Sequence, residues 1–171
     1  MDILKTANNW AKAEVFSSMF FIVVGILFVL AAIGFWQLGK TELAKAFVVP
    51  ISVAAVLLLI IGAGLVYSNQ SRIAEFPTAY EQDASAFVQS EIARAEKTMA
   101  EYQMIVFKIV PLIIVLAAFV IAFVGKSSWQ AIGMTTIALM IAILLIDSNA
   151  NARMETYHQQ LTLAEKNLKN E

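Results

Sequence analysis

The sequence contains no cysteine, and this absence removes several kinds of chemistry at once. Without thiols the chain has no disulfide bond, thiolate metal site or cysteine nucleophile. Histidine occurs once, at His158, so one chain cannot supply paired histidine ligands for haem within a membrane. No glycine-rich phosphate loop or nucleophile–base arrangement is present either. We therefore expect a protein that is not an enzyme and has no resident cofactor or metal.

Charge is also scarce. Only 15% of the residues are charged, against about 25% in soluble domains, and the net charge is -1. A chain with this balance is not expected to bind nucleic acid or to act as a strongly basic membrane-surface protein. No acidic side chain, arginine or histidine falls near the middle of an apolar run, so a proton relay or ion-coupled transporter lacks its usual groups.

Long apolar runs are what the sequence has in abundance, with 60% hydrophobic residues. Each run is long enough, at about 1.5 Å per helical residue, to cross a hydrocarbon core about 30 Å thick. The runs do not alternate in polarity as barrel strands do, so helices are expected. The sequence thus predicts an all-α integral membrane protein with four transmembrane helices, at Val15–Trp36, Ala46–Tyr67, Met104–Gly125 and Trp129–Ile146.

We interpret the four spans as two duplicated hairpins, because short motifs recur in the same order around equivalent spans. Val29-Leu30-Ala31-Ala32 returns as Val115-Leu116-Ala117-Ala118, and Ser-Asn sequences follow the second and fourth spans. The predicted organisation is an N-terminal amphipathic helix (1–14), hairpin 1 (15–67), a helical connection (68–103), hairpin 2 (104–146) and a C-terminal helix (147–171). The first run is too long for a typical signal peptide and is expected to stay in the membrane.

The positive-inside rule predicts the orientation. The two hairpin turns carry three lysines, whereas six basic residues near span ends lie on the opposite side. The N- and C-termini and the 68–103 connection are therefore expected in the cytoplasm, with the protein in a cell membrane of the bacterial inner-membrane type. Interfacial aromatics are expected at both boundaries, with Trp36 and Trp129 outside and Tyr67, Tyr102 and Trp10 inside.

The segments on that inner side also have helical patterns. The C-terminal tail spaces its apolar residues at 3.5 on average, a coiled-coil seam that we interpret as partner-binding: Met154, Tyr157, Leu161 and Leu168, with alanines between them. Phe76-Pro77-Thr78 predicts a turn, and Thr78 with Glu81 has the spacing of a capping box for a new helix. These helical extensions are expected to form a cytoplasmic stalk, with an irregularity near Asp83-Ala84-Ser85.

Lys108 is the one charge inside a span, and Asp147 ends the fourth span at a similar depth. Three interpretations are open: a structural ion pair between them, a lysine that extends to the interface, or a pathway for an ion or substrate.

Two further pairs occupy equivalent positions at the inner boundary: Glu14 with Arg72, and Glu101 with Arg153. We interpret them as salt bridges that clamp each hairpin, with a symmetrical gate as the alternative. Glu155 and His158 have the spacing of a dimetal-bundle motif, but a solvated helix face is the preferred interpretation. Ala118 with Ala122 and Ala138 with Ala142 are expected to pack span 3 on span 4.

Two functions of different class follow. The first is a non-catalytic membrane interaction protein, of an assembly, regulatory or immunity type, whose stalk binds a protein partner or self-associates. The alternative is a homo-oligomeric channel or transporter, in which the hydroxyls of Ser52, Thr135 and Thr136 face a shared pore. In both cases membrane lipid surrounds the spans.

Overall fold

The computed structural model describes residues 2–168, and within this range the chain is helical throughout with short turns and no strand. The elements are α1 (Ile3–Leu38), α2 (Glu42–Ala46), α3 (Val48–Gln82), α4 (Ala84–Glu101), the π-helical segment η1 (Tyr102–Ile109), α5 (Val110–Phe123) and α6 (Ser127–Leu168). Four continuous helical stretches are long and apolar enough to span a membrane, which confirms the predicted all-helical class. The predicted terminal segments also include residues 1 and 169–171, which lie outside the described range.

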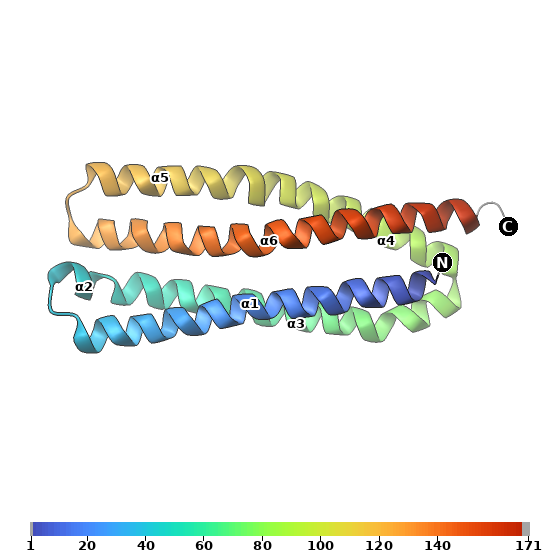
Figure 1. The fold of residues 1–171 in the computed structure, drawn as a ribbon, viewed down its shortest axis with the longest axis horizontal. Coiled ribbons are helices and arrows are strands. Elements are labelled where there is room, and N and C mark those ends of the chain that lie inside the picture. The colour runs from blue at the N-terminus through green and yellow to red at the C-terminus, as the bar shows by residue number, and fades with distance from the viewer. Residues whose placement is uncertain (1, 169–171) are drawn as a thin grey trace.

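The helices form two antiparallel pairs, and α6 is the element that joins them (Figure 1). We call α1 with α3 the first pair and α5 with α6 the second pair. α6 contacts α1, α2, α3, α4 and η1 as well as α5, whereas α5 contacts only α6 and η1. Helix α5 therefore lies at the outside of the molecule, and the two pairs meet along α6.

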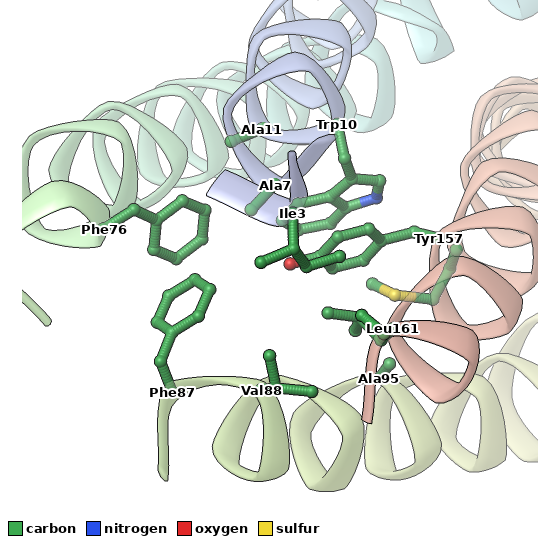
Figure 2. Close-up of a cluster of buried hydrophobic side chains, with 12 residues drawn as sticks. Ile3, Ala7, Trp10, Ala11, Phe76, Phe87, Val88, Ala95, Tyr157 and Leu161 are labelled. Atoms are coloured by element: carbon green, nitrogen blue, oxygen red, sulfur yellow. The ribbon is translucent and has the colours of Figure 1, made fainter. Parts of the chain in front are cut away.

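One end of the molecule is built from the polar segments 2–14, 68–103 and 147–168, which we call the polar end. Here α1, α3, α4 and α6 direct their apolar side chains toward one another (Figure 2). This cluster has 12 buried members, including Ile3, Phe76, Phe87 and Leu161, whereas the buried cluster between the apolar parts of the helices has four. The molecule is thus packed most extensively at its polar end.

The predicted turn at Pro77 is wrong, because α3 runs through Pro77 and ends at Gln82. The break falls at Asp83, whose carboxylate accepts a hydrogen bond from the backbone N–H of Ala86 at 2.8 Å and caps α4. This confirms the predicted irregularity near residue 83. Since Phe76, next to the proline, is buried in the polar-end cluster, tertiary packing outweighs the roughly 3 kcal/mol that an interior proline costs.

The boundaries predicted at residues 14 and 67 fall inside the continuous helices α1 and α3. The second long helix bends once near its start, since α2 ends at Ala46 and α3 begins at Val48. Between α4 and α5 the helix widens into η1, directly before Pro111. Proline clashes with the carbonyl four residues earlier in a regular α-helix, and the wider turns of η1 place that carbonyl differently.

Close contact within the first pair depends on two glycines. A side chain at Gly62 would come within about 3 Å of Phe21 and Ile22 on α1, and one at Gly25 would meet Leu59 on α3. In the second pair the equivalent close approach is made by Gly133 against Ala117 and Ile121. Ala118 and Ala122, which were expected to face α6, are exposed instead. Small residues therefore set the helix spacing, as is usual in membranes, but at other positions than the alanine spacing indicated.

We expect Gly62→Ile to separate α1 from α3 and to lower the stability of the purified protein by about 1–3 kcal/mol, the usual cost of overpacking. Gly64→Ile is the matched control, because nothing lies within 4 Å of a side chain added there. Thermal unfolding in detergent would measure both. Equal midpoints for the two variants would contradict the proposed contact.

Candidate functional site

A stack of three side chains lies at the centre of the polar end, where α1, α4 and α6 meet. The rings of Trp10 and Tyr157 are parallel to within 8°, with centroids 4.9 Å apart. The guanidinium of Arg94 lies over the Trp10 ring, 4.4 Å from its centroid. A cation held over the face of an indole is attracted by the ring quadrupole, and more strongly where water is excluded. Trp10, placed at the lipid interface by the sequence analysis, is thus a buried member of this stack.

Glu91 binds two members of the stack, Arg94 and Tyr157. Its carboxylate accepts from Arg94 Nε at 2.9 Å and from the Tyr157 hydroxyl at 2.8 Å, while its side chain is almost completely buried. Burial raises the pKa of Tyr157, and the neighbouring Glu91 charge raises it further, so the phenol keeps its proton and donates. Burial lowers the pKa of Arg94, but the hydrogen bonds and charge of Glu91 outweigh it and the pKa is raised. Arg94 therefore stays charged.

A second ion pair links the two helical pairs one turn nearer the apolar region. Arg153 Nε on α6 donates to Glu14 Oε1 on α1 at 2.8 Å, and Glu14 is only 8% exposed. Breaking a buried pair by removing one partner is costly, because it leaves the other charge desolvated. The Glu14–Arg153 pair therefore ties the first pair to the second.

The partners of these charges differ from those expected. Glu14 was assigned to Arg72 and Glu101 to Arg153, one pair within each hairpin. In the structure Glu14 binds Arg153 of the other pair, Arg72 donates to Asn69 Oδ1 at 2.7 Å, and Glu101 lies 4.0 Å from Lys97 in an exposed contact. The predicted partners are wrong because α6 crosses beside α1, so residues that are equivalent by sequence are not opposite each other in space.

Lys108 lies in η1 with an exposed side chain, and Asp147 lies half-buried in α6. Among residues 2–168 no ion pair between them is present within 4.0 Å. This arrangement is compatible with a lysine that extends along the lipid interface to reach water.

The predicted partner-binding seam packs inside the molecule itself. Met154, Tyr157 and Leu161 are buried against α1 and α4, and Leu168 packs against the edge of the same cluster. The interpretation of this seam as partner-binding is therefore wrong, because helices of the same chain cover it. An apolar spacing of 3.5 residues shows which face of a helix is covered. In this protein the helices that cover it belong to the same chain.

Glu155 and His158 do not converge on a metal position. Asn151 donates to Glu155 at 2.7 Å, and His158 Nε2 lies 3.5 Å from Glu96 Oε1. Within the described range no three acidic, histidine or cysteine side chains are placed to hold a metal ion. These contacts are those of a partly solvated helix surface.

The stack and its acceptor were missed by the sequence analysis, although a signal exists. Trp10 precedes Glu14 by one helical turn, and Tyr157 follows Arg153 by one turn, so the two pairs form successive rungs between antiparallel α1 and α6. A tyrosine within a buried apolar seam also requires a hydrogen-bond acceptor, which Glu91 supplies.

Most of the contacts of these groups are with one another, which favours a structural role. Glu91 is bonded to Arg94 and Tyr157, and Glu14 is bonded to Arg153, so both carboxylates hold neighbouring helices together. Comparison with protein-family models, curated proteins and solved structures finds no match to this chain.

Replacing Tyr157 with Phe removes the hydroxyl from Glu91 and preserves the ring stack. We expect a loss of about 1.5 kcal/mol, the usual worth of a hydrogen bond to a charged group. Tyr67→Phe, at an exposed position, is the control and should be neutral. Unfolding of the purified variants in one detergent measures both, and equal stabilities would show that the Tyr157–Glu91 bond contributes nothing.

Proposed function

We propose that the protein is a non-catalytic integral membrane protein that acts by binding a protein partner through the solvent-exposed surface of its polar end. The observation that carries this proposal is the packing of that end. Four helices form a bundle with a core of its own, held by the Trp10–Arg94–Tyr157 stack and the Glu14–Arg153 pair. A bundle this well packed presents a rigid surface, which lowers the entropic cost of binding.

The surface of the polar end is polar almost everywhere, with one exception. Leu163 on α6 is 57% exposed, whereas Leu161, two residues earlier, is completely buried. Among the described residues of the polar end, Leu163 is the one large aliphatic side chain that is so exposed. An exposed leucine surrounded by polar side chains matches the arrangement of a protein interface, in which an apolar centre lies within a polar rim. The partner surface is therefore proposed around Leu163, in place of the buried seam.

A photoreactive amino acid at position 163 tests this proposal in cells. We expect a covalent adduct with a specific protein. A competing untagged wild-type copy should reduce the yield of this adduct, whereas a competing Leu163→Glu copy, which lacks the apolar contact, should leave the yield unchanged. The matched control is the same amino acid at position 161, where burial prevents access to any partner. The proposal fails if position 163 yields the same adducts as position 161.

We further propose that the polar end lies in the cytoplasm, in a bacterial inner membrane, and that the two helical pairs arose by duplication. The orientation is supported by the six basic residues near the span ends on this side, against three in the turns. The duplication rests on the recurring motifs, such as Val29–Ala32 and Val115–Ala118. In this arrangement the polar end is the cytoplasmic stalk.

Reporter enzymes fused after Glu171 and inserted at Gln89, an exposed position on α4, test the orientation. Both reporters are expected to show a cytoplasmic location. A reporter placed at Lys126, in the turn before α6, should show the opposite side of the membrane. Signals from opposite faces for the first two would exclude an even number of crossings.

The channel alternative has weaker support. Ser52 donates to the carbonyl of Val48 in its own helix at 2.7 Å and is exposed on α3. Thr135 and Thr136 line an apolar groove between α3 and α6 that does not include Ser52. The three hydroxyls thus do not share a wall within one chain.

A further inference from the structure

A groove between α1 and α6 continues from the polar end into the apolar region. Its polar part has a volume of about 550 Å³ and its apolar part about 500 Å³, and the two share Asn149 and Arg153. Helices α1 and α6 run antiparallel (Figure 1), so their facing residues form pairs spaced one helical turn apart. The polarity of the groove lining can therefore be compared from one pair to the next.

The polar part is lined by neutral polar side chains and a single charge. That charge is Arg153, and the neutral residues include Thr6, Asn9, Trp10 and Gln160. Two buried donors here have no acceptor among the described residues: Trp10 Nε1 and Arg153 Nη2. Trp10 is 7% exposed, and Arg153 uses only its Nε for Glu14. Unpaired buried donors are costly, and both belong to side chains that line this groove, which favours a ligand with acceptor oxygens.

The apolar part is lined mostly by aromatic rings and aliphatic side chains. Phe16, Phe20 and Phe28 of α1 face Ala138, Ala142 and Leu145 of α6. Along α6 the lining runs from Ala138 to Asn149, about 16 Å of helix, and half of a hydrocarbon core is about 15 Å. The groove therefore reaches through one leaflet, and Arg153 stands where the phosphate layer of that leaflet lies.

We propose that this groove binds an anionic phospholipid of the leaflet at the polar end, with an acyl chain along Phe20 and Phe28 and the headgroup phosphate on Arg153 and Trp10. A phosphate accepts from both unpaired donors, and arginine matches its geometry well. An apolar helix from a second copy would fill the apolar part but would bring no acceptor to Arg153. This site is independent of the proposed protein contact, because Leu163 does not line it.

Arg153, the single charged side chain of the groove, predicts a preference for lipids with a net negative charge. One basic side chain at a membrane surface contributes about 1 kcal/mol toward an anionic lipid, which corresponds to about a fivefold preference. Glu14 competes with the phosphate for Arg153, so Glu14→Gln should increase the preference. Arg153→Gln should abolish it.

Native mass spectrometry of the full chain in detergent provides the test. The protein is mixed with equimolar phosphatidylglycerol and phosphatidylcholine of identical acyl chains, and the ratio of the retained lipids is measured. We expect about five for the wild type, about one for Arg153→Gln, and a higher ratio for Glu14→Gln. Arg72→Gln is the matched control, because Arg72 lies outside the groove, and its ratio should stay at the wild-type value.

A second pair of variants tests the apolar part. Ala142→Phe should reduce retention of both lipids, whereas Ala118→Phe, on the exposed face of α5, should not. The proposal is overturned by a wild-type ratio near one, by equal losses in Arg153→Gln and Arg72→Gln, or by full retention in Ala142→Phe. Displacement of the lipid by millimolar inorganic phosphate would overturn it in favour of a free-phosphate site, and a protein dimer without retained lipid would overturn it in favour of a second copy. Because Glu14→Gln is expected to raise the ratio, a general folding defect cannot produce the predicted pattern.

Discussion

The contact of α6 with α1 at the polar end is the constraint on which the architecture depends. Each helical pair is held by its own close approaches, at Gly25 and Gly62 in the first pair and at Gly133 in the second. The two pairs are joined mainly where Trp10 meets Tyr157 and Glu14 meets Arg153. The hydrophobic effect strengthens this contact between the pairs, because burying apolar surface is favourable only where the alternative is exposure to water. The same helix faces gain much less from association within lipid.

This difference between the two solvents explains the uneven packing. In the apolar windows of the four long helices only 17–28% of the residues are buried inside the molecule, and most large aliphatic side chains point outward. Helices in lipid remain helical without neighbours, since all their backbone bonds are internal. The polar segments are instead stabilised as helices by packing around a shared core. A grooved apolar region attached to a compact polar end is the expected result.

Features that depend on composition and length could be predicted from the sequence, and features that depend on helix crossing could not. Four uninterrupted apolar runs predict four spans because lipid permits few other structures. The 3.5 spacing from Met154 to Leu161 correctly indicated a covered face, since periodicity depends on the helix alone. Its cover could not be identified, because that depends on how α6 lies across α1 and α4. The ion pairs were misassigned for the same reason: sequence equivalence between Glu14 and Glu101 says nothing about which arginine lies opposite each.

Pro77 shows how packing can override a local signal. A proline followed by a threonine and a glutamate has the pattern of a helix start, yet α3 continues until Asp83 caps the next helix. Phe76 and Phe87 meet edge to face across this corner, with ring centroids 5.4 Å apart. Ending α3 at Pro77 would shift the corner by several residues and rotate Phe76 out of the cluster that also holds Ile3 and Trp10. The length of α3 beyond its apolar part is therefore set by the position of the aromatic core, and this core in turn holds α1 beside α6, where the groove forms.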